Sequence, residues 1–134
     1  MSDQQEWLKR FLQEIGAVAG TVHLYQQGGL RLSAAVNIPD KVQQVVAWVP
    51  SGKGMAGLAL ERGEPVYTCN LKDDRSGDVR PGAKAVDARA AIAFPVRDQS
   101  GTIVAIVGAA FNDERTFGPD EVSQIRKAGA SLGN

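Results

Sequence analysis

Hydrophobic side chains at the start of the chain recur at the spacing of one helix face and stop before a glycine. The members of this stripe are Trp7, Leu8, Phe11, Leu12 and Ile15. Ser2 and Gln5 have the spacing of a capping box, and Gly16 follows the last apolar residue. The pattern predicts an amphipathic helix whose apolar side covers either the edge of a core or a second subunit.

After Gly16 the apolar positions alternate with polar ones, which is typical of strands. Val18, Val22 and Leu24 alternate in this way within residues 17–27. Gly28 and Gly29 predict a tight turn, because glycine tolerates the positive φ of hairpin turns. Residues 30–36 then form the returning strand. Residues 42–49 fit either a strand or a short helix that runs into a strand.

A short helix and a short strand precede a long polar segment. Residues 55–62 form the predicted helix, which Gly63 ends, and residues 66–69 form the strand. Residues 70–89 carry almost no apolar side chains. A stretch of this length without regular structure is usually a lid, a binding loop or a disordered segment.

The last part of the chain predicts a second hairpin and a terminal helix. Residues 91–97 and 102–111 flank a turn, and the second strand is apolar on both faces, so it should lie centrally in a covered sheet. Pro119 suits the first position of a helix, and Phe117 and Val122 have the spacing of a hydrophobic staple. The side chains expected to face inward are Val122, Ile125, Ala128 and Leu132.

This order of elements, with the short helix at Gly54-Met55-Ala56-Gly57 and the apolar hairpin before Phe111, resembles the GAF domain family over nearly the whole chain. The resemblance implies an α+β fold in one domain spanning residues 1–134. It implies a central antiparallel sheet of about five or six strands with the terminal helices on one face. A pocket closed by helix and loop segments would lie on the other face.

Composition and charge exclude several classes of partner. The chain is 43% hydrophobic, and 15 basic residues balance 15 acidic ones, so no positive field favours nucleic acid. No apolar run is long enough to cross a membrane, and the N-terminus does not look like a secretory signal. The single cysteine, Cys69, cannot form an internal disulfide, which fits a reducing compartment. We therefore expect a cytoplasmic protein without a nucleic-acid or membrane partner.

His23 is the only histidine, and we interpret it as a packed or hydrogen-bonded side chain of a strand. A zinc site needs several ligands, and the chain offers one histidine and one thiol. We expect neither a metal site nor a cofactor.

Cys69 fits either a small buried residue at a strand end or a redox thiol whose pKa the nearby Lys72 lowers. GAF domains that reduce free methionine sulfoxide use several cysteines, one at the place that Ala56 holds here. Residues 81–89 supply no other thiol, so this activity is not expected. Bilin-binding GAF domains need an anchoring cysteine with a histidine beside the chromophore. Cys69 is not followed by such a histidine, and His23 lies far upstream, so a bilin is not expected.

Cyclic-nucleotide GAF domains carry a signature that Asn112, Phe117, Asp120 and Glu121 match in part. Asp113 stands where that signature has a lysine, so its ion pair cannot form. The same residues also fit plain structural roles at the end of a strand and the start of a helix.

Three features indicate where a ligand would bind. Basic side chains of the polar loop suit a carboxylate or phosphate, or are simply solvated. Ala91 and Ala93 with Gly108 and Ala110 could form a surface of small side chains, which leaves cavity volume or admits a close helix. The aromatic candidates fit pocket walls or plain core. The full candidate set is Trp48, Met55, Leu58, Tyr67, Cys69, Asn70, Arg80, Lys84, Arg89, Ala91 and Ala93.

No catalytic triad, carboxylate pair or phosphate loop is readable in the sequence. The resemblance therefore implies a non-catalytic sensory domain that binds an unidentified small molecule and signals to a partner protein in trans. The alternatives are a relative of free methionine-(R)-sulfoxide reductase with a single-thiol role for Cys69, and a dimerisation module without a ligand. We expect a homodimer through the terminal helices, with Trp7 and Phe11 at or beside the interface.

Overall fold

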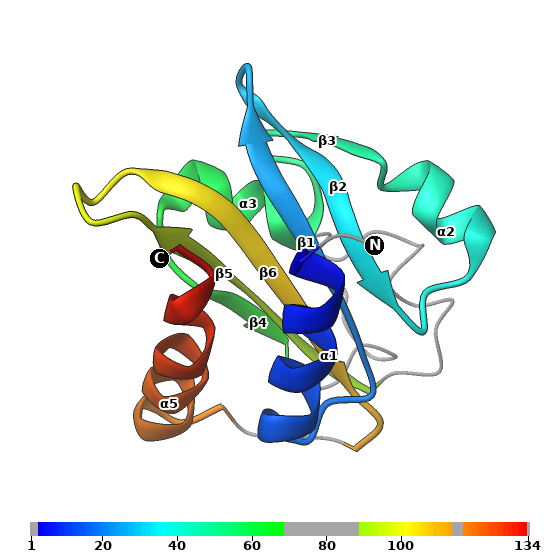
Figure 1. Ribbon diagram of the computed structural model, residues 1–134, viewed down its shortest axis with the longest axis vertical. Helices are drawn as coiled ribbons and strands as arrows, with labels where there is room; N and C mark the ends of the chain where they lie inside the picture. The colour runs from blue at the N-terminus through cyan, green and yellow to red at the C-terminus, as the bar shows by residue number, and fades with distance from the viewer. Residues whose placement is uncertain (1–2, 69–88, 114–116, 134) are drawn as a thin grey trace.

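The computed structural model describes residues 3–68, 89–113 and 117–133, which form an antiparallel sheet with helices on both faces (Figure 1). The helices are α1 (Asp3–Ile15), α2 (Asp40–Val45), α3 (Gly54–Arg62), α5 (Pro119–Gly129) and the short 3₁₀ helix η2 (Ala130–Gly133). The strands are β1 (Ala19–Gln26), β2 (Gly29–Val36), β3 (Trp48–Pro50), β4 (Val66–Thr68), β5 (Ala90–Arg97) and β6 (Ile103–Phe111). None of the described helices combines the length and apolar character needed to cross a membrane.

The six strands lie in the order β3-β2-β1-β6-β5-β4, and every neighbouring pair is antiparallel. β6 therefore lies between β1 and β5 with a helical layer on each side, which confirms the central strand predicted from its two apolar faces. The predicted α+β class and antiparallel sheet are confirmed as well.

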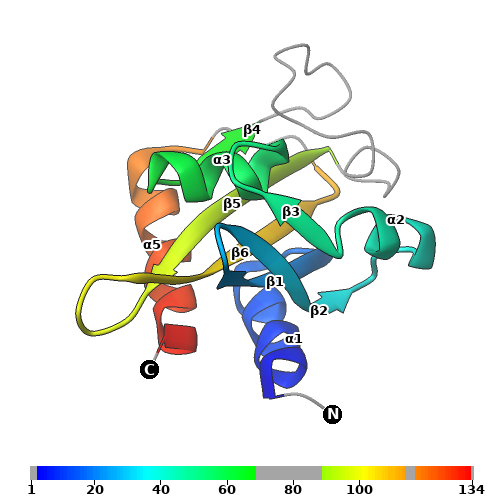
Figure 2. The same cartoon turned by 90° about the horizontal axis from the view of Figure 1, so that it is seen from above.

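The terminal helices α1 and α5 lie side by side over one face of the sheet (Figures 1 and 2), as predicted. Aromatic rings join the layers. The rings of Trp7 and Phe11 stack with centroids 5.0 Å apart, and the Phe11 ring lies 5.9 Å from that of Phe94 on β5. Phe117 and Val122 both join this cluster at the start of α5, as the staple spacing predicts.

The two aromatic residues expected at or beside a dimer interface, Trp7 and Phe11, differ in their exposure. Phe11 is only 2% exposed, because it packs between Trp7 and the sheet. Trp7 is half-buried, and its indole Nε1 donates a hydrogen bond to Ser131 Oγ at 2.8 Å. Phe11 is thus part of the core within the chain, and Trp7 alone remains as a partly exposed aromatic of the predicted pair.

The opposite face of the sheet is covered by α3, which packs over β5 and β6 (Figure 2). A second buried cluster holds this layer together, and its members are Leu30, Val49, Ala59, Val66, Ala93 and Ile106. α3 ends at Gly63, which adopts the left-handed conformation, as the sequence predicts.

The structure resolves the ambiguous segment and corrects one turn. Residues 42–49 contain the end of α2 and the start of β3, so the helix-then-strand alternative is the one observed. In the first hairpin the positive φ angles belong to Gln27 (51°) and Gly28 (82°), whereas Gly29 lies in β2. Gly29 instead makes room for Trp48, because the indole of Trp48 occupies the space that a Cβ at position 29 would take.

Candidate functional site

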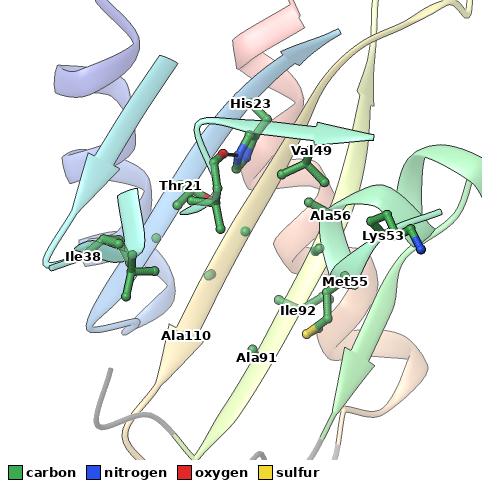
Figure 3. Close-up of a pocket in the computed structure, with 17 residues that line it drawn as sticks. Thr21, His23, Ile38, Val49, Lys53, Met55, Ala56, Ala91, Ile92 and Ala110 are labelled. Carbon is green, nitrogen blue, oxygen red and sulfur yellow. Dashed lines mark hydrogen bonds between the residues drawn. The ribbon is translucent and has the colours of Figure 1, made fainter. Parts of the chain in front are cut away.

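A cavity lies between the second face of the sheet and the segments around α2 and α3 (Figure 3). The strand register places Ala91 opposite Ala110, and Ala93 opposite Gly108, which in turn lies opposite Thr21 of β1. Because residues two positions apart in a strand share a face, these small side chains form one continuous floor.

The walls of the cavity are almost entirely apolar, and its volume is about 140 Å³. They come from the loop before α2, α2 and its C-cap, β3, and the first turn of α3. The apolar wall residues are Ile38, Val42, Val46, Val49, Met55 and Ala56. A space of this size and character suits a small, largely apolar molecule.

His23 is the most buried polar side chain at the cavity, with 2% of its surface exposed. Its Nε2 lies 2.9 Å from the main-chain oxygen of Val46, so the ring connects β1 in the floor to the end of α2 in the wall (Figure 3). Its Nδ1 is buried without a hydrogen-bond partner in the described part of the chain. Nε2 therefore makes a hydrogen bond within the fold, whereas Nδ1 makes none with the described residues.

Burial lowers the pKa of the His23 imidazole below its ordinary value of 6.5, and the hydrogen bond to Val46 opposes this shift with a smaller effect. The cause is desolvation, since a charged ring loses more hydration than a neutral one. His23 is consequently neutral at neutral pH.

The other polar side chains of the described lining are Thr21 and Lys53. Thr21 is half-buried beside Gly108, and Lys53 is exposed at the edge of the cavity, where its ammonium group extends away from His23 (Figure 3). In the described ranges, no cluster of three or more His, Cys, Asp or Glu side chains is placed to hold a metal ion.

A protein-family model described as GAF domain matches residues 5–134. The chain belongs to the GAF domain family. GAF domains are, broadly, sensory and regulatory domains. No curated protein matches this one.

Several solved structures share the fold. A type II free methionine-R-sulfoxide reductase from Thermoplasma acidophilum matches with a TM-score of 0.71 and 16% identity, covering 98% of this chain and 84% of that one. A Staphylococcus aureus NreA protein mutated in its nitrate binding site matches with a TM-score of 0.70 and 16% identity, covering 92% of this chain and 99% of that one. The GAF domain of a phosphoenolpyruvate-protein phosphotransferase from Coxiella burnetii matches with a TM-score of 0.65 and 19% identity, covering 95% of this chain and 90% of that one. At these identities the likeness shows the GAF fold alone.

The predicted site residues separate into three groups in this GAF domain. Met55, Ala91 and Ala93 line the cavity. Leu58 packs into the core cluster under α3, and Arg89 is exposed before β5, with its main-chain N–H donating to the oxygen of Phe111 at 2.8 Å. Cys69, Asn70, Arg80 and Lys84 lie outside the described residues.

The two aromatic candidates lie away from the cavity lining. Trp48 is 46% exposed and covers Gly29, while Tyr67 is 48% exposed with its ring centroid 5.3 Å from that of Phe117. Both belong to short edge strands in which the neighbouring residue, Val49 or Val66, is the buried one. Alternation along these strands therefore directs the aromatic rings to the other side of the sheet.

The sequence interpretation missed His23, Thr21 and the α2 segment as cavity residues. Thr21 and His23 follow the same alternation as the alanines of β5, which is the signal that could have placed them on the floor. No local pattern could have placed α2 beside the cavity, because this helix is short and has no fully buried residue.

The residues that match part of the cyclic-nucleotide signature have structural positions. Phe117 is buried in the cluster under the terminal helices, whereas Asn112, Asp113 and Asp120 are exposed. Asp120 and Glu121 lie in the first turn of α5, where negative charge is favourable. None of them belongs to the described lining of the cavity.

Proposed function

We propose that this GAF domain is a non-catalytic sensory domain that binds a small molecule in the cavity over Ala91, Ala93 and Gly108. The observation that carries the proposal is the cavity itself, about 140 Å³ in volume, above strands that carry alanine and glycine in place of larger side chains. Protein interiors are close-packed, and an unfilled cavity lowers stability. A ligand would restore those missing contacts.

The character of the lining supports binding rather than bond chemistry. Its described polar side chains are Thr21, His23 and Lys53, with no carboxylate among them to orient a general base. One nitrogen of His23 already serves the hydrogen bond to Val46. Ala56 supplies only a methyl group to the wall, at the place where the resemblance to the reductases puts a cysteine.

A signal would leave the domain most directly through α2. This helix has no fully buried residue, so little packing resists its movement. Val42 and the C-cap residue Val46 line the cavity, while Val45 is 53% exposed on the outside. A ligand that contacts the inner side chains would shift the outer one, which gives an as yet unidentified partner protein an apolar contact to recognise. The cytoplasm is the compartment we propose, since one cysteine fits a reducing environment.

Native mass spectrometry before and after denaturation, joined to a thermal-shift screen of small molecules, tests the binding proposal. We expect either a co-purified molecule or a stabilising compound. Ala91→Leu should abolish the effect by filling the cavity, whereas Ala130→Leu, which adds the same side chain at an exposed position of η2, should retain it. Absence of any ligand effect in the parent, or equal binding by folded Ala91→Leu, would contradict the proposal.

A further inference from the structure

The ring nitrogen of His23 that has no described hydrogen-bond partner indicates which class of ligand fits the cavity. The main-chain oxygen of Val46 can only accept a hydrogen bond, so His23 Nε2 must carry the hydrogen that is donated across 2.9 Å. A neutral imidazole has one N–H, and Nδ1 is then a bare acceptor with its lone pair in the plane of the ring. This tautomer is fixed by the fold, before any ligand is present.

A buried acceptor without a donor is unusual and costs stability. His23 is 2% exposed and lines the cavity, and its Nδ1 has no partner among the described residues. The described charged or titratable groups around the cavity are His23 itself and Lys53, whose ammonium group extends away from the ring (Figure 3). A hydrogen-bond donor for Nδ1 must therefore come from a group other than these described side chains.

The position of the ring matches the shape of the floor. Thr21 and His23 share one face of β1, and they lie opposite Gly108 and Ile106 of β6. The floor of small side chains thus ends where the larger His23 and Ile106 begin. A flat ligand lying on Ala93 and Gly108 would have its edge near the imidazole.

The volume of the cavity and its apolar walls limit the size and charge of the ligand. A cavity of about 140 Å³ is close to the roughly 150 Å³ of an engineered apolar cavity that binds benzene, so one aromatic ring fits within it. Apolar walls penalise a charged ligand that lacks a counter-ion. A fully deprotonated oxyanion such as nitrate is doubly disfavoured, because it has no hydrogen to donate and would face the lone pair of Nδ1.

We propose that the cavity binds a neutral ligand of about the size of a single aromatic ring, which donates an O–H or N–H hydrogen bond to Nδ1 of His23. This inference rests on the proposed function, because it names the ligand class of the same cavity. It excludes nitrate and other small oxyanions as the ligand of this site.

Phenol and fluorobenzene are matched probes, since they differ mainly in whether the ring carries a donor. Calorimetric titration of the full chain should give about tenfold tighter binding of phenol, the factor expected for one hydrogen bond to a buried acceptor. His23→Gln keeps an amide N–H that can reach Val46 and moves its acceptor, the amide oxygen, away from the Nδ1 position, so its phenol preference should fall towards one. His23→Asn keeps an oxygen near the Nδ1 position and should retain part of the preference.

A measurement on the unmodified protein protects the test against a variant that fails to fold. His23 is the only histidine, so its ring ¹⁵N signals are unambiguous. The Nδ1 signal should move when phenol is added and stay in place with fluorobenzene. Equal binding of both probes without movement of the Nδ1 signal would overturn the ligand class and leave the binding function standing. Nitrate competing with the probes would overturn it too, and no binding of any probe or co-purified molecule would overturn both proposals.

Discussion

Gly57 of α3 lies so close to Pro50 of β3 that a Cβ atom on Gly57 would stand 2.5 Å from the main-chain oxygen of Pro50. A hydrogen bond fixes the same two segments, because the N–H of Gly52 donates to the oxygen of Gly57 at 2.8 Å. This approach holds the first turn of α3, with Met55 and Ala56, over the cavity. The glycine in this turn thus has a packing role that builds the wall of the site.

Gly57→Ala should therefore destabilise the domain, even though alanine is favoured over glycine in a helix interior by about 1 kcal/mol. The added methyl group meets a main-chain atom, which cannot rotate away, and overpacking of this kind costs about 1–3 kcal/mol. Urea unfolding should show a lower midpoint than the parent. Gly118→Ala is the control for a methyl group that meets no other atom, since its Cβ would have nothing within 4 Å. Because Gly118 is the N-cap of α5, where alanine is less favourable than glycine, only the loss beyond this control is assigned to the contact with Pro50. An unchanged midpoint for Gly57→Ala would mean that β3 can move away from the added methyl group at little cost in free energy, which would contradict the packing role of Gly57.

The cavity floor could be predicted from the sequence because it depends on alternation alone. Ala91 and Ala93 share a face of β5, and their partners Ala110 and Gly108 share the matching face of β6. Once a hairpin is predicted, its register follows from the turn. Small side chains on both strands then indicate a surface that is either hollow or closely covered.

The cavity walls and the acceptor on His23 could not be predicted in the same way. Whether His23 is buried depends on where α2 lies, and that helix is short and has no fully buried residue. The directions of Trp48 and Tyr67 could not be predicted for a related reason. In strands of three residues, the direction of each side chain is set by pairing with β2 or β5 rather than by a visible period.

His23 should make the stability of the domain depend on pH below neutrality. Its pKa is lowered by burial in the folded state, so well above pH 6.5 both folded and unfolded chains have a neutral ring and the burial of His23 brings no pH-dependent loss of stability. As the pH falls through 6.5, the unfolded chain binds the proton first. The free energy of unfolding then decreases until the folded-state pKa is reached.

The measurement is urea unfolding at about pH 7.5 and about pH 5, compared with His23→Gln. The parent should lose more stability between these values than the variant does. Asp98 does not interfere, because the Ser100 hydroxyl and nearby main-chain N–H groups lower its carboxyl pKa below the ordinary value of 3.8. Equal losses of unfolding free energy in parent and variant would show that His23 takes up a proton as readily in the folded chain as in the unfolded chain.

Cys69 should support no turnover of free methionine sulfoxide or peroxide. It is the only cysteine, and a thiol cycle that closes on an internal disulfide needs a second one. Assays with an added small-molecule thiol, run on the parent and on Cys69→Ser, should give the same background rate. Activity in the parent that Cys69→Ser abolishes would favour the single-thiol alternative over a sensory role.

The last prediction concerns assembly through α1 and α5, which we propose as the surface of a homodimer. Trp7 is the residue to test, because it is half-buried on α1 and its ring lies on Phe11, while its Nε1 bonds to Ser131. Phe11→Glu would be uninformative, since a carboxylate at a site 2% exposed would disrupt the core itself.

Light scattering should give twice the 14.2 kDa chain mass for the parent, and Trp7→Glu should return it to one chain with an unchanged circular dichroism spectrum. Tyr25→Glu is the matched control, because Tyr25 is 48% exposed near the tip of the first hairpin and belongs to neither helix. A parent that stays monomeric at high micromolar concentration would leave the partly exposed edge of Trp7 as ordinary surface, and would assign signalling to the α2 side of the domain.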